Sequence, residues 1–205
     1  CPWTRRQGRA GWAWGAGGCG CFGPAVGDTE KPLVAVDGEP MIDRVVAALR
    51  ASALSTIAAA VSPATPETAA YLAEMDGVDP IETAGAGYVA DLDDALAGLD
   101  RPTVTVAADL PLLTADHIDR AVAAAGDDSL SVCVPASIPE TLGLSAEPTF
   151  DHAGETVVPT GLNIVGDTTK RTAVWEAPRL AFNINRPADY QVVAAWLDGD
   201  TQTNL

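Results

Sequence analysis

The sequence has few positive charges and almost no lysine. Of its 205 residues, 12 are Lys or Arg and 28 are Asp or Glu, so the formal net charge is −16. The lysines are Lys31 and Lys170. Nucleic acids are bound through clustered Lys and Arg, so this composition excludes a general nucleic-acid-binding surface. A small anionic ligand held by a few placed cations remains compatible with it. Such an acidic surface is typical of a salt-rich cytosol, where salt screens self-repulsion.

Long apolar runs are also missing. No stretch reaches the roughly 18 consecutive apolar residues of a membrane-spanning helix, so no membrane span is expected. Arg, Gln and Gly interrupt the first residues, which excludes the apolar stretch of a signal peptide and predicts a cytoplasmic protein. Apolar residues make up 47% of the chain, enough for the core of one compact domain.

Metal-ligating side chains are scarce. The chain has four Cys and two His, and Cys19 and Cys21 are the only closely spaced pair. Because structural zinc usually takes four such ligands, a Cys/His zinc site is not expected. His117 and His152 are isolated in the sequence and are predicted to lie at the surface or at helix ends.

Residues 1–23 differ in composition from the rest. They hold three of the five Trp, three of the four Cys and seven of the 19 Gly, but no Asp or Glu. We therefore divide the chain into an anomalous Gly/Arg/Trp-rich segment, 1–23, and a domain at 24–205. One hypothesis is that the segment was deduced in a shifted reading frame or from a wrong start. No apolar strand is recognisable in residues 9–15.

From residue 30 onward, short apolar runs alternate with helical patterns, which predicts an α/β fold. The sheet is expected to be Rossmann-like, mostly parallel and flanked by helices, with ligands at the carboxyl ends of its strands. Residues 136–156 are expected to form a loop. Strands are predicted at 33–36, 55–61, 78–82, 104–106, 129–134, within 157–165 and at 181–184, and helices at 41–49, 65–75, 88–96, 114–125 and 186–197.

Several residues follow predicted strands or lie in Gly-rich loops, and could bind a nucleoside triphosphate. Lys31 supplies a cation for phosphates, and the glycines Gly85 and Gly87 allow close backbone approach. Magnesium prefers hard oxygen ligands, so Asp109, at the end of a buried strand, and Asn185 are candidates. Each of these residues also has an ordinary structural explanation, as a surface charge or a turn residue.

The order of these segments resembles a known family. The matching pieces cover residues 28–198 and are Glu30-Lys-Pro-Leu33, Gly38-Glu-Pro-Met-Ile-Asp-Arg44, Val61-Ser-Pro-Ala-Thr-Pro66, Thr83–Tyr88, Ala108-Asp109-Leu110, Pro159-Thr-Gly-Leu-Asn163 and Phe182-Asn-Ile-Asn185. With them the chain is similar to the nucleotidyltransferases of the nucleotide-diphospho-sugar transferase fold, and within these to the archaeal GTP:adenosylcobinamide-phosphate guanylyltransferases. These enzymes transfer GMP from GTP to adenosylcobinamide phosphate and release pyrophosphate during cobalamin synthesis and salvage.

The resemblance implies roles for individual residues. Lys31 and Asp109 would be catalytic, with Mg²⁺ as cofactor and Asp109 and Asn185 as its ligands. GTP and adenosylcobinamide phosphate would be the partners, and a homodimer remains open. The expected acceptor-binding residues are Gly161, Asn163, Asn183 and Asn185. The expected nucleotide-binding residues are Gly17, Gly18, Gly20, Lys31, Ser62, Pro63, Thr83, Gly85, Gly87 and Asp109.

One departure from the family pattern leaves alternatives open. The family begins with a strand and a Gly-Gly-x-Gly-Thr-Arg loop, whereas here Cys21 and Phe22 stand at the Thr and Arg positions. The alternatives are a nucleotidyltransferase acting on molybdopterin or a sugar phosphate, and a degenerate, non-catalytic nucleotide-binding protein. The dinucleotide-binding pattern Gly18-x-Gly20-x-x-Gly23 is weak evidence for an oxidoreductase, because no strand is predicted before it.

Overall fold

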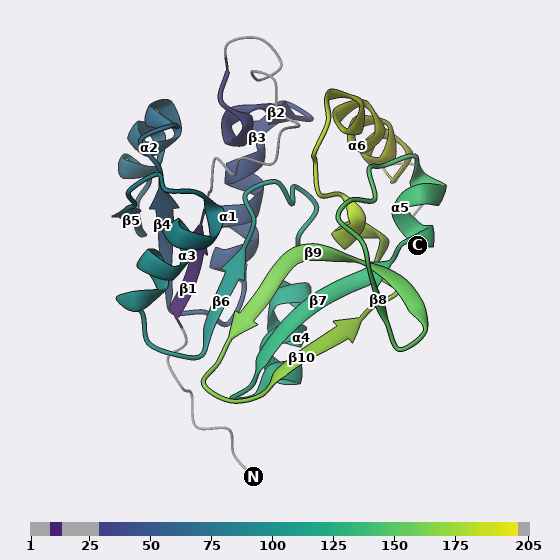
Figure 1. The fold of residues 1–205 in the computed structure, drawn as a ribbon. Coiled ribbons are helices and arrows are strands. Elements are labelled where there is room, and N and C mark those ends of the chain that lie inside the picture. Colours follow the sequence, from purple (N-terminus) through teal and green to yellow (C-terminus); the bar gives the residue numbers. More distant parts are fainter. Residues whose placement is uncertain (1–8, 14–28, 201–205) are drawn as a thin grey trace.

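The computed structural model describes residues 9–13 and 29–200, and their main element is one mixed β-sheet (Figure 1). Seven strands follow one another across it in the order β10-β7-β9-β6-β1-β4-β5, and β8 pairs with β9. The strands are β1 (Arg9–Ala13), β4 (Thr56–Val61), β5 (Val78–Glu82), β6 (Thr103–Val106), β7 (Ser129–Pro135), β8 (Phe150–His152), β9 (Glu155–Val165) and β10 (Lys170–Val174).

Strand direction confirms the predicted α/β class. The pairs β5–β4, β4–β1, β1–β6 and β7–β10 are parallel. β9 is antiparallel to its neighbours β6, β7 and β8. Parallel strands need helical crossovers, which accounts for the alternating pattern in the sequence. A separate two-stranded ribbon joins β2 (Ala35–Val36) and β3 (Glu39–Pro40).

Helices cover both faces of the sheet. α1 and α4 lie behind the sheet in Figure 1 and contact each other, and α3 contacts β1 and β4. None of the helices in the described part of the chain is long and apolar enough to cross a membrane. The helices are α1 (Met41–Ala51), α2 (Pro66–Ala73), α3 (Tyr88–Ala97), α4 (Ala115–Ala125), α5 (Ser137–Leu142) and α6 (Pro187–Asp200), with short 3₁₀ turns η1 (Lys31–Leu33) and η2 (Pro178–Ala181).

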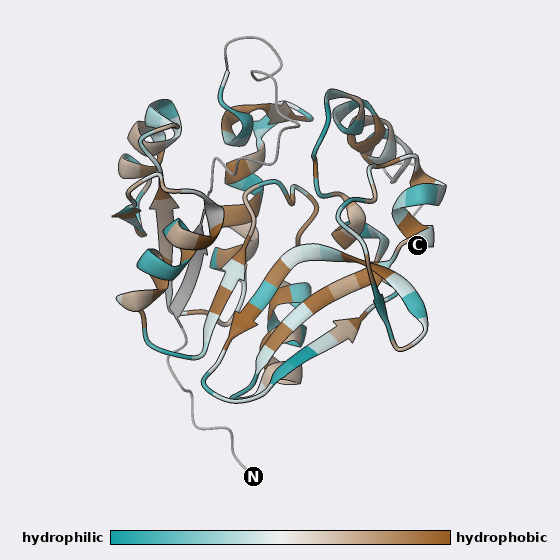
Figure 2. Cartoon of the chain, viewed as in Figure 1, coloured by the Kyte–Doolittle hydropathy of each residue, from teal (hydrophilic) through white to brown (hydrophobic). Residues whose placement is uncertain are grey.

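The core lies between α1, α4 and the central strands. Ile42 and Leu49 of α1, Ile118 of α4 and Leu162 of β9 are fully buried. Figure 2 shows the apolar residues of β6, β7 and β9 as brown bands. Since burial of apolar side chains is the dominant stabilising term, this core fixes the strand ends that carry the candidate site.

The structure corrects several predictions. Residues 9–15 contain a strand after all, because β1 pairs with β4 along Thr56–Ala60 and with β6 at Thr103 and Val104. The predicted loop 136–156 contains α5 and β8, and the predicted strand 181–184 is instead the end of η2 and an irregular segment. β10 was not predicted. Backbone hydrogen bonds from two neighbouring strands can hold β1 extended although its sequence lacks β-branched residues.

The first turn of α4 contains one of the two histidines, at a helix end as predicted. The Thr114 backbone N–H donates to His117 Nδ1 at 3.2 Å, and the His117 backbone N–H donates to the Thr114 hydroxyl at 3.4 Å, which forms a capping box. Burial, followed by the positive charges of Arg179 and Arg120, lowers the pKa of His117 below its ordinary value of 6.5. The neutral ring is therefore the form that caps the helix.

This cap predicts a loss of stability in mild acid. Because the pKa of His117 is lower in the folded than in the unfolded protein, its contribution is complete above pH 6.5 and is lost as the pH falls from there towards the folded pKa. We expect the free energy of unfolding of the wild type to decline over this range by more than that of His117→Gln, which retains an acceptor without titrating. Urea unfolding of both proteins at pH 5 to 8 measures the difference, and parallel curves would contradict the prediction.

Candidate nucleotide-binding and transfer site

The two residues predicted to be catalytic form an ion pair. Lys31 Nζ lies 2.7 Å from Asp109 Oδ2, although the residues are 78 positions apart in the sequence. Lys31 opens η1, and Asp109 follows the carboxyl end of β6. Their side chains are 13% and 14% exposed, so water screens the attraction only partly. A cation and a carboxylate thus meet at the edge of the sheet where ligands bind in α/β folds.

The residue before the lysine fixes this segment to α2. The Glu30 carboxylate accepts hydrogen bonds from the backbone N–H groups of Glu67, at 3.0 Å, and Thr68, at 2.7 Å. These groups lie in the first turn of α2, where N–H donors have no partner within the helix and the helix dipole favours negative charge. Glu30 therefore caps α2 and at the same time positions the neighbouring Lys31.

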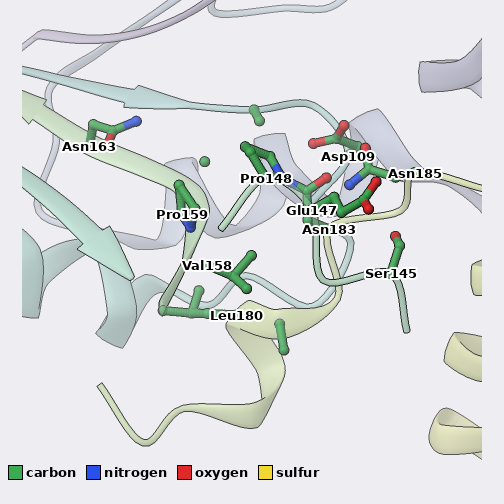
Figure 3. Close-up of a pocket in the computed structure, with 13 residues that line it drawn as sticks. Asp109, Ser145, Glu147, Pro148, Val158, Pro159, Asn163, Leu180, Asn183 and Asn185 are labelled. Atoms are coloured by element: carbon green, nitrogen blue, oxygen red, sulfur yellow. The ribbon is translucent and has the colours of Figure 1, made fainter. Parts of the chain in front are cut away.

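Two asparagines border the same carboxylate. With its amide nitrogen facing Asp109, Asn183 donates to Oδ2 at 3.2 Å and to Oδ1 at 3.3 Å. The Ile184 backbone N–H donates to the Asp109 carbonyl oxygen at 3.0 Å, which ties the segment before α6 to the end of β6. In Figure 3, Asn183 and Asn185 lie beside Asp109. Two of the four predicted acceptor residues are therefore next to the predicted catalytic carboxylate.

A pocket of about 390 Å³ opens beside this cluster (Figure 3). All four predicted acceptor residues line it, together with Asp109. Asn163 lies away from Asp109 in Figure 3 and its Oδ1 accepts a hydrogen bond from the Ser131 hydroxyl at 2.9 Å, so it also joins β9 to β7. The other lining residues are Ala107, Ser145, Glu147, Pro148, Val158, Pro159, Leu180 and Ala181.

A bulge in β9 shapes the wall of the pocket. The pairing of β9 with β7 is irregular between Ser131 and Cys133, and Gly161 has a φ of +89° at this point. A Cβ on Gly161 would lie 2.8 Å from the Cβ of Ala107, too close for two carbon atoms. Glycine is therefore required here by both backbone conformation and space, and bulges of this kind are common beside active sites.

Replacing this glycine should destabilise the fold. Gly161→Ala adds strain at a positive φ and an overlap with Ala107, which together cost roughly 2 kcal/mol. For a chain of this length we expect Tm to fall by about 4–8 °C. Gly98→Ala is the matched control, because Gly98 has a φ of −94° and open space around it. Differential scanning calorimetry of both variants tests this, and equal Tm values would contradict it.

The predicted nucleotide-binding loops after β4 and β5 lie against each other. A Cβ on Gly85 would be 3.2 Å from Pro63 and 3.4 Å from the Ser62 hydroxyl. Thr83 donates to the Val61 carbonyl through both its backbone N–H, at 2.9 Å, and its hydroxyl, at 3.1 Å. Gly87, with a φ of +112°, precedes the first turn of α3. The structure thus brings Ser62, Pro63 and Gly85 together, but none of the predicted residues in these loops lines the pocket next to Asp109.

The predicted glycines Gly17, Gly18 and Gly20 lie outside the described residues. Within 29–200, no three His, Cys, Asp or Glu side chains are grouped so that they could hold a metal by themselves. One carboxylate, Asp109, with Asn185 beside it, instead suits Mg²⁺, which often binds one or two carboxylates and takes its other ligands from phosphates and water.

Sequence reasoning missed Ser145, Glu147 and Tyr190. Ser145 and Glu147 lie in the segment between α5 and β8 and line the pocket, but nothing in their local pattern indicates this. Burial, followed by the negative charges of Asp109 and Asp189, raises the pKa of Tyr190 to about 12. Tyr190, on α6, is therefore a neutral phenol near the carboxylates of Asp109 and Asp189.

The sequence profile of the MobA-like NTP transferase domain matches residues 17–189. The chain belongs to this family. It is therefore a nucleotidyltransferase, as the resemblance implied, and the matched range contains both Lys31 and Asp109.

A curated relative of this MobA-like transferase is similar over most of its length. The chain is 29% identical over 192 residues to the adenosylcobinamide-phosphate guanylyltransferase of Methanocaldococcus jannaschii, covering 87% of this chain and 94% of the relative. The resemblance stated from the motifs is thus confirmed by the full-length comparison.

Solved structures confirm the fold. CMP:2-keto-3-deoxy-manno-octonic acid synthetase, complexed with CTP, superposes with a TM-score of 0.61 at 12% identity, over 94% of this chain and 99% of that one. The 2-C-methyl-D-erythritol 4-phosphate cytidylyltransferase of Thermus thermophilus gives a TM-score of 0.60 at 15% identity, over 92% and 98%. The nucleotide-diphospho-sugar transferase type of fold, predicted from the motifs, is therefore correct.

Proposed function

We propose that this transferase moves GMP from GTP to adenosylcobinamide phosphate. The observation that carries the proposal is the partly buried Lys31–Asp109 pair at the end of β6, bordered by a pocket large enough for a phosphate-bearing group. The identity of the acceptor comes from the Methanocaldococcus jannaschii relative, whose name specifies adenosylcobinamide phosphate.

On the nucleotide side, Lys31 provides the positive charge. An ammonium group bound to a triphosphate neutralises charge that increases as the leaving pyrophosphate separates. The paired loops at Ser62–Pro63 and Gly85–Gly87 support the proposed position of the nucleoside, because they lie at the carboxyl ends of neighbouring parallel strands.

On the acceptor side, the described pocket lining contains no Lys or Arg. Asp109 and Glu147 are its charged groups, and their ion pairs with Lys31 and Arg186 leave the site without net positive charge, so a phosphate entering it needs a further cation. We assign Asp109 and Asn185 to hold Mg²⁺ together with the triphosphate, and the ion would then neutralise charge on both phosphates. The apolar residues Val158, Pro159 and Leu180 would contact the organic part of the acceptor.

The reaction needs no protein nucleophile. An oxygen of the acceptor phosphate attacks the α-phosphorus of GTP, a new P–O bond forms, and the bond from the α-phosphorus to the bridging oxygen breaks. Pyrophosphate leaves with the electron pair, and the product is adenosylcobinamide-GDP. The protein contributes position and charge neutralisation, which is the usual basis of catalysis in phosphoryl-group transfer.

Pyrophosphate release tests the proposal. We expect release that requires Mg²⁺, GTP and adenosylcobinamide phosphate together, measured in a buffer of high potassium chloride. Asp109→Asn keeps the shape of the side chain but removes its charge, and turnover should fall by about 10²-fold or more. Rapid release with molybdopterin or a sugar phosphate, and none with adenosylcobinamide phosphate, would assign a different acceptor.

Wild-type protein that binds Mg·GTP but turns over none of these acceptors would contradict a catalytic role for the pair. Asp198→Asn is the matched control, because Asp198 is exposed on α6 and does not line the pocket. It should retain wild-type turnover.

A further inference from the structure

The Asp189 carboxylate is buried and accepts four hydrogen bonds from two separate segments. It is 2% exposed. Its Oδ1 accepts from the Ser145 backbone N–H at 3.2 Å, and its Oδ2 accepts from the Ser145 hydroxyl at 2.9 Å. The same Oδ2 accepts from the backbone N–H groups of Asn185 and Arg186, each at 2.8 Å. One side chain thus joins the segment just before its own helix to Ser145, which lies 44 positions earlier in the sequence.

These two segments form different parts of the pocket wall. Ser145, Glu147 and Pro148 line it from the segment between α5 and β8. Asn183 and Asn185 line it from the segment before α6, which is also bonded to Asp109 through the Ile184 N–H. Asp189 therefore fixes the distance between the wall at Ser145 and the wall at Asn185, which contacts Asp109.

Helix capping alone does not require this arrangement. An acidic residue in the first turn of α6 can bond back to the N–H groups before the helix, and the bonds to Asn185 and Arg186 do so. The bonds to Ser145 are not needed for capping, and the Ser145 segment that makes them helps to shield the carboxylate from water. A buried carboxylate is tolerated only when its hydrogen-bond sites are filled, so both segments must be in place together.

We propose that Asp189 is a positioning residue that sets the width of the acceptor pocket by holding Ser145 to Asn185 and Arg186. This inference rests on the proposed function, which makes the pocket the acceptor site. Asp189 does not line the pocket and acts through the residues that do.

Two substitutions separate the two sides of this connection. In Asp189→Asn, an oxygen at the Oδ2 position can keep the bonds to Asn185, Arg186 and the Ser145 hydroxyl, while the amide NH₂ faces the Ser145 backbone N–H and cannot accept from it. The Ser145 segment is then held by its hydroxyl alone, and two N–H donors face each other at its backbone. In Asp189→Ala all four bonds are lost, and the wall at Asn185 is released as well. Asp198→Asn, on the exposed side of the same helix, is the control.

The kinetic expectation is a selective loss of acceptor binding. In Asp189→Asn, KM for adenosylcobinamide phosphate should rise about tenfold, because the displaced pocket residues bind the acceptor less well. KM for GTP should stay within about twofold of wild type, because the residues proposed to bind GTP are not displaced. In Asp189→Ala, kcat should also fall. A purely structural role would reduce the active fraction, lowering apparent kcat with both KM values unchanged, and that result would overturn the proposal.

Amide hydrogen exchange, followed by NMR, tests the connection without any substrate. In Asp189→Asn, the Ser145 amide should exchange faster than in Asp198→Asn, while the amides of Asn185 and Arg186 remain protected. In Asp189→Ala all three should exchange faster. If the Ser145 amide of Asp189→Asn exchanges as slowly as that of Asp198→Asn, the proposal is overturned, whatever the turnover of the variant.

The two assays also separate this proposal from the proposed function. Wild-type protein without turnover on adenosylcobinamide phosphate would refute the proposed acceptor, while the exchange result would still decide on Asp189. If Asp189→Ala does not fold, Ser145→Ala removes only the hydroxyl bond, and its KM for the acceptor should shift less than that of Asp189→Asn, in the same direction.

Discussion

The ion pair between Lys31 and Asp109 is the contact on which the rest of the site depends. Each residue is mostly shielded from water, and a shielded charge is tolerated only with a partner. The pair joins the segment that caps α2 through Glu30 to the end of the central strand β6. Segments from opposite halves of the chain must therefore be folded before the two charges meet, and the proposed nucleotide and acceptor sides then share one carboxylate.

The pocket proposed to bind the acceptor depends on how the chain returns across the sheet. β9 runs antiparallel between β6 and β7, and its bulge at Gly161 brings its backbone against Ala107, two residues before Asp109. The segment before α6 then closes the site through Asn183 and the Ile184 N–H. The close approach of the β9 backbone to Ala107, which only glycine permits at position 161, thus shapes the pocket next to Lys31 and Asp109.

Much of the fold was predictable because it repeats simple patterns. Thr103–Val106 is buried throughout and reads as a central strand, and the helical spacing in 41–51 places its apolar residues on the core. Other elements depend on distant partners. Arg9–Ala13 is a strand because β4 and β6 bind its backbone, not because of its side chains. Residues 181–184 do not form a strand, although three of the four are apolar, because the Ile184 N–H bonds to the Asp109 carbonyl instead of to a sheet neighbour.

In the candidate site, too, some residues are recognisable from local sequence and others depend on distant partners. Lys31 and Asp109 could be found from motifs, because their charges, the Glu-Lys-Pro-Leu motif and the place of Asp109 after a buried strand are local features of the sequence. The contact of Ser145 with Asp189 could not, since the two are 44 residues apart and each has an ordinary local explanation. Three-dimensional packing alone determines that Asp189, in the first turn of α6, reaches the opposite wall of the pocket.

The central claim is that Lys31 and Asp109 act as one unit in nucleotidyl transfer. A double-mutant cycle on kcat/KM, with Lys31→Met, Asp109→Asn and the double variant, tests it most directly. Each single variant should lose about 10²-fold or more, and the double variant should lose little beyond the worse single one, because either change already disrupts the unit. Losses that multiply in the double variant would show independent roles and contradict the claim.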